Sequence, residues 1–122
     1  MIEEPNTLIE QIFANFIVNG QAIPVSFLRY EGKNTTYVTY QQAFSNDAFS
    51  GDDDLQNYVD FYDFDIYSKG NYLPIVEAIK QILKDNGFRW QPTHSSGDMY
   101  EDDTGYYHKT LSFSIERSTN NG

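Results

Sequence analysis

The chain contains no cysteine, which excludes a disulfide framework and any chemistry of a thiol group. It has no apolar run that approaches the ~20 residues of a membrane-spanning helix. Its first residues, MIEEPNTLIEQ, are acidic and have neither the basic region nor the apolar core of a signal peptide. We therefore expect a soluble protein of the cytoplasm, where proteins rarely rely on disulfides.

Basic residues are also scarce, because eight Lys and Arg stand against eighteen Asp and Glu. The formal net charge is −10. Nucleic-acid binding draws its affinity from clustered Lys and Arg, and anionic membranes attract the same positive charge. The composition therefore argues against specific nucleic-acid binding and against a membrane partner. It is compatible with a protein that DNA passes without sticking to it.

Aromatic residues, in contrast, are abundant, with ten Tyr, nine Phe and one Trp. A disordered chain would not carry so many. The 122 residues are enough for one domain that buries its own core, and we predict a single domain over residues 1–122. Tyrosine combines an apolar ring with a polar tip, which is favoured at surfaces that a partner covers.

The segment from Tyr58 to Phe88 organises the predicted fold. Tyr58–Tyr67 is rich in aromatic residues and predicts a long central strand, with a bulge near Phe61-Tyr62 or partial cover on both faces. The apolar residues that follow recur every three or four positions, which predicts an amphipathic helix. The stripe of that helix comprises Ile75, Val76, Ile79, Ile82 and Leu83. We expect Asn71 to cap its first turn and Gly87 to close its last turn.

The residues before this segment predict a helix, two strands and a loop. The helix is expected over Pro5–Asn19, and Asn19-Gly20 ends it. Pro24–Tyr30 and Thr35–Gln42 are expected to form a hairpin. Ala43–Gln56 has no sustained period and predicts a functional or mobile loop. The buried stripe of the first helix is expected to comprise Leu8, Ile9, Ile12, Phe13, Phe16 and Ile17.

The residues after this segment predict two further strands. Phe88–Gln91 is the shorter one, and Pro92–Thr104 is expected to be a polar, mobile loop. In Tyr106–Arg117 apolar and polar residues alternate, which predicts the longer strand. Its residues Leu111, Phe113 and Ile115 are expected to face the core, and Thr110, Ser112, Ser114 and Glu116 to face out. The order α-β-β-β-α-β-β predicts an α+β fold, a two-layer sandwich of a mainly antiparallel sheet with two helices on one face.

Acidic clusters are the most conspicuous polar feature of the sequence. They are Asp52-Asp53-Asp54, the strand residues Asp60, Asp63 and Asp65, and Glu101-Asp102-Asp103. None has the spacing of a calcium loop, and runs of charge are usually solvated. The two histidines, His94 and His108, lie far apart in the sequence, and no nucleophile elbow or phosphate-binding loop accompanies them. The sequence therefore predicts no catalytic, cofactor-binding or metal-binding residue.

Several segments, taken together, resemble one protein family. They are an opening helix, FLRY, TYVTYQ, DFDIYSKGNY, LPIVEAIKQILKDNGF and DMYEDDTGYYHKTLSFSIER. In these segments the chain resembles the tail terminator, or tail-completion, proteins of long-tailed bacteriophages and of prophages of Gram-positive bacteria. Neighbouring families of small phage head-tail joining proteins have similar sizes and α+β folds.

The resemblance implies a structural assembly protein without enzymatic activity. Such proteins form a ring, typically of six subunits, on the head-proximal end of the tail tube. They end tube polymerisation and present a surface to the head-tail connector. The implied partners are further copies of the chain, the tail-tube protein and the connector protein. The implied locations are the host cytoplasm during assembly and the tail-head junction of the virion.

The family has no motif for its contact residues, so composition guides the prediction of an interface. We expect it to include Tyr37, Tyr40, Phe44, Phe49, Asp52, Asp53, Asp54, Tyr58, Tyr100 and Tyr106. Two other functions are open. One is a monomeric acidic binding module that mimics nucleic acid or acts as an immunity-type factor. The other is a metal-dependent hydrolase that uses Asp63 and Asp65.

Overall fold

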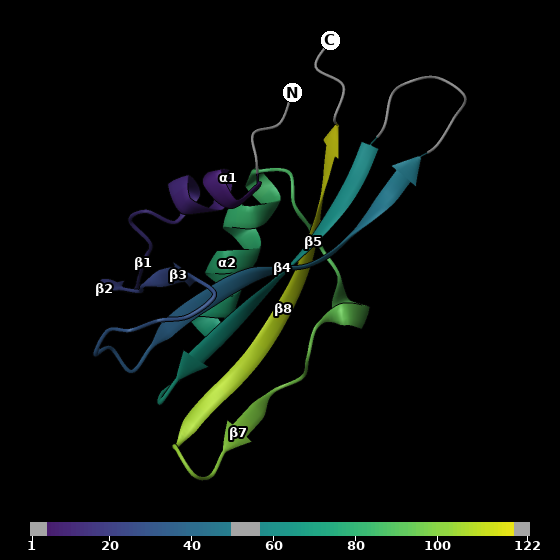
Figure 1. Ribbon diagram of the computed structural model, residues 1–122. Coiled ribbons are helices and arrows are strands. Elements are labelled where there is room, and N and C mark those ends of the chain that lie inside the picture. The colour runs from purple at the N-terminus through teal and green to yellow at the C-terminus, as the bar shows by residue number, and fades with distance from the viewer. Residues whose placement is uncertain (1–4, 50–56, 119–122) are drawn as a thin grey trace.

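Two layers make up the fold, a twisted sheet and two helices that pack against one of its faces (Figure 1). The computed structural model describes residues 5–49 and 57–118. The elements in chain order are α1 (Pro5–Ile12), β1 (Ile17–Val18), β2 (Gln21–Ala22), β3 (Val25–Phe27), β4 (Tyr37–Phe49), β5 (Asn57–Ser68), α2 (Leu73–Asp85), β6 (Arg89–Trp90), the 3₁₀ helix η1 (Pro92–His94), β7 (Met99–Glu101) and β8 (Tyr106–Ser118). The predicted fold class is confirmed.

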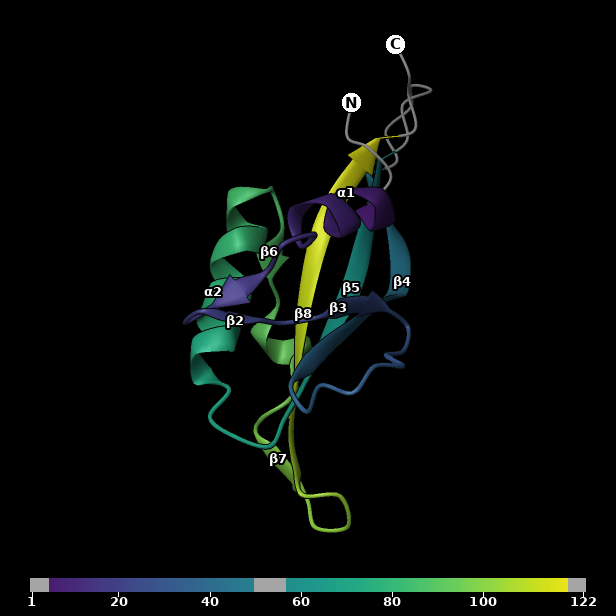
Figure 2. The ribbon, with the colours of Figure 1, turned by 90° about the vertical axis from the view of Figure 1, so that its left-hand side faces the viewer.

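Three long antiparallel strands, β4, β5 and β8, form the middle of the sheet. At one edge β3 pairs with β4, and at the other edge β6 and β7 both pair with β8. The strands β1 and β2 form a separate hairpin. Seen along the sheet, α1 and α2 lie on the same side of it (Figure 2). We call that side of the sheet the covered face and the opposite side the open face.

The core lies between the helices and the covered face. Along β5 the side chains alternate without interruption, with Tyr62, Phe64 and Ile66 buried and their neighbours partly exposed. The stripe of α2 packs on them as predicted, through Ile75, Val76, Ile79 and Leu83. The β8 residues Leu111, Phe113 and Ile115 are also buried as predicted.

Local signals fix both ends of α2. The side-chain oxygen of Asn71 accepts a hydrogen bond of 3.1 Å from the N–H of Leu73, as expected, although the residue that flanks the helix is Tyr72. At the other end Gly87 takes a φ of 91°, which glycine adopts without steric cost. The N–H of Phe88 then donates to the carbonyl of Leu83 at 2.9 Å, which is the pattern of a Schellman motif.

The first helix is shorter than predicted. It ends at Ile12, and the chain then turns and forms the β1–β2 hairpin. Phe13 and Phe16 are still buried, but they reach the core from the turn, whereas Ile17 is exposed. Asn19-Gly20 joins β1 to β2 with both residues at positive φ, so this dipeptide is a hairpin turn and not a helix stop.

The predicted hairpin of residues 24–42 is wrong, because β3 and β4 are parallel. The predicted loop over Ala43–Gln56 is also wrong as far as Phe49, since β4 continues to that residue. The irregularity expected near Phe61-Tyr62 lies in the neighbouring strand. There Gln42 and Phe44 pair with consecutive residues of β5, which leaves Ala43 as the extra residue of a bulge.

The segment Pro92–Thr104 is more ordered than predicted, because it contains η1 and β7. Residues 91–96 lie against β8 and bury two of its serines, Ser112 and Ser114, which we expected to face out. The side chain of Gln91 donates to Ser114 at 2.8 Å, and the Ser95 hydroxyl accepts from the N–H of Ser112 at 2.9 Å.

Candidate functional site: the open face and the two sheet edges

A stack of four rings crosses the open face at the end where β4 begins. Tyr37 is its centre and lies 4.6 Å from Tyr30 and 5.0 Å from Tyr67 between ring centroids. His108 continues the stack at 4.2 Å from Tyr67. Tyr106 meets Tyr37 edge-on at 6.0 Å. All five rings are partly exposed, so the stack is neither core nor free surface.

The ionisation of this stack is suppressed. Burial, followed by the nearby Asp65 carboxylate, raises the pKa of Tyr67 to about 12. Burial and the neighbouring Tyr106 also raise the pKa of Tyr37. Both phenols are therefore neutral at physiological pH.

Two carboxylates follow the ring stack along β5. Asp65 accepts from the Thr110 hydroxyl and lies 3.2 Å from Nε2 of His108, so it is held by the protein on two sides. Burial and the charge of Asp65 raise the pKa of Asp63, while a hydrogen bond from Ser112 opposes that rise. Asp63 and Asp65 are partly buried, unlike the exposed phosphates of DNA, so this pair does not favour the function of a nucleic-acid mimic.

The far part of the open face carries a second aromatic group. Phe44 and Phe61 stack with their centroids 4.4 Å apart, and the His94 ring lies edge-on to Phe61 at 5.7 Å. His108 lies beside Tyr67, six residues from Phe61 along β5, which corresponds to about 20 Å. The two histidines therefore do not form a pair. Within residues 5–49 and 57–118, no three His, Asp or Glu side chains are arranged to hold a metal ion.

Exposed apolar side chains concentrate at the two edges of the sheet rather than on either face. Seven of the nine large apolar residues that are exposed in the described ranges lie there; the other two are Ile17 and Phe44. At the β3 edge they are Phe27 and Leu28. At the β8 edge, where β6 and β7 pair, they are Leu73, Trp90, Met99, Tyr100 and Tyr107. The two edges are four strand spacings apart, roughly 19 Å at ~4.8 Å per strand.

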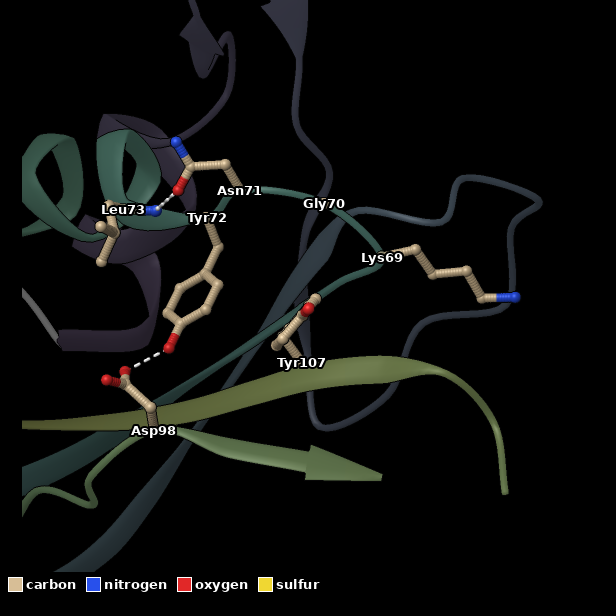
Figure 3. Close-up of a pocket in the computed structure, with 7 residues that line it drawn as sticks. All are labelled: Lys69, Gly70, Asn71, Tyr72, Leu73, Asp98 and Tyr107. Atoms are coloured by element: carbon tan, nitrogen blue, oxygen red, sulfur yellow. Dashed lines mark hydrogen bonds between the residues drawn. The ribbon is translucent and has the colours of Figure 1, made fainter. Parts of the chain in front are cut away.

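The β8 edge contains a hollow of about 510 Å³ between the start of α2 and strand β8 (Figure 3). Tyr72, Leu73 and Tyr107 form its apolar wall, and Asp98 lies at one end. The side chain of Lys69 points away from it, and its amino group lies over the Tyr106 ring, 5.1 Å from the centroid. The hollow is therefore a mainly apolar recess with one carboxylate at its rim.

A polar contact fixes that carboxylate. The Tyr72 hydroxyl donates to Asp98, and Nζ of Lys109 lies 3.3 Å from the same oxygen. These two donors lower the pKa of Asp98. Burial, followed by the contact with Asp98, raises the pKa of Tyr72 to about 12. The contact joins Tyr72, which precedes α2, to the segment before β7.

The structure distributes the predicted interface residues over several environments. Tyr37, Phe44 and Tyr106 lie on the open face, and Tyr100 lies on β7 at the β8 edge. Tyr40 is buried in the core, which contradicts its assignment to an exposed interface. Of the remaining predicted residues, Tyr58 is partly exposed on β5. The backbone of Phe49 ends β4, but its side chain is outside the described part. The other three, Asp52, Asp53 and Asp54, lie outside the described residues.

Apart from Tyr100, sequence reasoning missed the exposed apolar residues of the two edges. Phe27 and Leu28 are consecutive and apolar at the end of a short strand, so alternation cannot bury both. Leu73 stands outside the apolar stripe of α2, which signals exposure. Tyr107 lies on the opposite side of β8 from Tyr106. These signals exist in the sequence but become visible only when the strand order is known.

No protein-family model matches the chain, and no curated protein matches it in sequence. The resemblance to tail terminators therefore stays a prediction. Among the described residues, no helix is both long enough and apolar enough to cross a membrane.

Proposed function

We propose that the protein is a structural assembly factor of the tail-terminator kind. In this proposal copies of the chain associate into a ring on the head-proximal end of a phage tail tube. The ring ends polymerisation of the tube and provides the joint to the head-tail connector. The observation that carries the proposal is the concentration of exposed apolar side chains at two different edges of one sheet.

Two unlike edges favour a head-to-tail contact between copies. A contact in which one surface meets a different surface of the next copy generates either a closed ring or an open filament. A two-fold dimer would instead need one self-complementary patch. The β3 edge and the β8 edge lie on opposite sides of the protomer, which suits addition of copies in one direction. Ring closure then gives the arrangement that a cap on a tube requires.

The charge of the chain supports a position around a DNA channel. A ring at the head-tail joint surrounds a path through which DNA moves, and a net charge of −10 repels phosphate. A lumen of this kind does not retain the DNA. Acidic character without a cluster of Lys and Arg is therefore consistent with the proposal.

Native mass spectrometry and negative-stain electron microscopy test this function. We expect a ring of about six copies, as the resemblance implies, either for the chain alone or after addition of tail-tube protein. A strict monomer at high protein concentration, both alone and with the tail-tube protein, would overturn the proposal. An acidic DNA mimic is the main rival, and inhibition of a DNA-binding enzyme by the monomer would favour it.

A further inference from the structure

The backbone at Leu28 takes a conformation that a leucine rarely adopts. Its φ is 67°, and the N–H of Arg29 donates to the carbonyl of Phe27 at 2.7 Å, two residues back along the chain. This is a γ-turn with its central residue in the left-handed region, a rare and strained form. A bulky residue at positive φ is an outlier because its Cβ crowds the backbone.

The strained turn leaves its apolar side chains exposed. The Leu28 side chain is 57% exposed and Phe27 is 49% exposed, so the turn presents two apolar side chains to solvent. The N–H of Leu28 donates to the carbonyl of Tyr40 at 2.9 Å, which anchors the turn to β4. Strained backbone of this kind persists where the surroundings enforce it, and it clusters at sites of function. A projecting, anchored and apolar turn is suited to insertion into a recess.

The hollow at the other edge is such a recess. Its volume is about 510 Å³, and a cavity of ~150 Å³ already holds a benzene ring. The hollow therefore has room for a phenyl ring and a leucine side chain together. Leu73 and Tyr107, which line it, are themselves exposed, so an inserted turn would bury apolar surface on both sides.

The charges beside the turn and beside the hollow are complementary. Residues 27–36 contain two basic residues, Arg29 and Lys33, and one acidic residue, Glu31, which pairs with Arg29. Residues 96–105 contain four acidic residues and no basic one. The segment 27–36 therefore has a positive balance although the chain as a whole is acidic. Placing it against residues 96–105 relieves repulsion that most other surfaces of a second copy would impose.

We propose that the Phe27-Leu28 turn of one copy inserts into the hollow between α2 and β8 of the next copy. The inference rests on the proposed function, because it takes a second copy of the chain as the occupant. It adds the residues that meet and the direction of the contact. Each copy uses its turn on one side and its hollow on the other, so every copy in a closed ring makes the same two contacts.

Cysteine cross-linking tests the contact directly, because the natural chain has no cysteine and gives no background. Two single variants, Leu28→Cys and Leu73→Cys, are mixed and treated with a short bis-maleimide. The matched control mixes Phe44→Cys, an exposed position on the open face, with Leu73→Cys. We expect at least about tenfold more covalent dimer from the first mixture, because assembly holds its thiols at millimolar effective concentration.

The outcomes separate this inference from the proposed function. Rings or oligomers in native mass spectrometry, together with a dimer yield no higher than in the control, would overturn the contact and leave the assembly function standing. Absence of any assembly, alone or with tail-tube protein, would overturn both. A chain that carries both cysteines should give a ladder of linked oligomers, because each copy then has two linkable sides.

A glycine variant of the turn provides a second test. Leu28→Gly removes the inserted side chain and relieves the backbone strain, so the melting temperature should not fall. Self-association should weaken at least about tenfold, since a buried leucine side chain is lost from the contact. Ile17→Ala, which removes an equally exposed side chain from β1, should leave self-association unchanged. Unchanged self-association of Leu28→Gly, or a loss confined to binding of the tail-tube protein, would overturn the contact between copies.

Discussion

The two faces of the long strands β4, β5 and β8 differ in how far their side chains are buried. On the covered face, Tyr62, Phe64 and Ile66 are fully buried against the helices. On the open face, Phe61 and Tyr67 are partly exposed and pack mainly on other rings. One face therefore buries the core of the protomer, whereas the other face and the edges leave aromatic and apolar side chains partly exposed.

A matched pair of substitutions on β5 tests this difference most strongly. Phe64→Ala should lower the free energy of unfolding by about 3–5 kcal/mol, because it leaves a cavity among buried rings. Phe61→Ala removes the same atoms three residues away on the open face, where the ring stacks on Phe44, and should cost about 1 kcal/mol. Urea denaturation of both variants measures the two values. Equal losses would contradict the division of roles between the faces.

The tyrosines predict a loss of stability in alkali. Tyr67 and Tyr72 each have a folded pKa of about 12 against 10.0 for an unfolded tyrosine. The folded state therefore holds these protons more tightly, and stability is lost as the pH rises from 10 to about 12. Tyr67→Phe should reduce this loss. Thermal unfolding at several pH values between 8 and 12 tests the prediction, and a loss as steep in Tyr67→Phe as in the natural chain would contradict it.

Asp63 predicts a smaller effect of the same sign at acidic pH. Its pKa is raised from 3.8 in the folded state, so ionisation of this carboxyl destabilises the fold. Asp63→Asn should stabilise the protein near neutral pH by less than ~1 kcal/mol, since solvent screens a partly exposed charge. The gain should vanish as the pH falls below 3.8, where the natural carboxyl is protonated in both states. A gain that does not depend on pH would point to a cause other than charge.

A further, local effect concerns the loop that carries Tyr30. A Cβ at Gly32 would collide with the Tyr30 hydroxyl, which also accepts from the N–H of Asn34 at 3.0 Å. Gly32→Ala should therefore displace the Tyr30 ring from Tyr37 and cost about 0.5–1.5 kcal/mol, the worth of one aromatic pair. Near-ultraviolet circular dichroism reports the stack. An unchanged spectrum would mean that the ring moves without leaving Tyr37.

Local signals explain what the sequence could predict. The helix α2 is encoded by its own stripe, by Asn71 before it and by Gly87 after it, so each of its features is read within a few residues. The alternation of β5 and of Leu111, Phe113 and Ile115 in β8 likewise needs no knowledge of distant contacts. These elements form the larger part of the core.

Long-range geometry explains the features that could not be predicted from the sequence. Phe13 and Phe16 continue the period of α1 although the helix has ended, because a turn can also direct two rings into the core. Neither strand carries a local sequence signal for the parallel pairing of β3 with β4. Tyr37 and Tyr40 look alike in sequence, yet one is on the open face and the other is buried, since the helices cover only one side. The positive φ of Leu28 likewise has no local signature.

The bulge at Ala43 sets which way the outer half of β4 faces. If Ala43 were paired regularly in the ladder, Phe44 would share the parity of Val38 and Tyr40 and turn towards the helices. With the bulge, Phe44 stacks on Phe61, and Ser45 instead reaches the buried Asp60, to which its hydroxyl donates. Pairing this alanine regularly would exchange the faces of Phe44 and Ser45, whereas deleting it would leave Phe44 opposite Phe61, so the bulge accommodates an extra residue without changing which side these two side chains face.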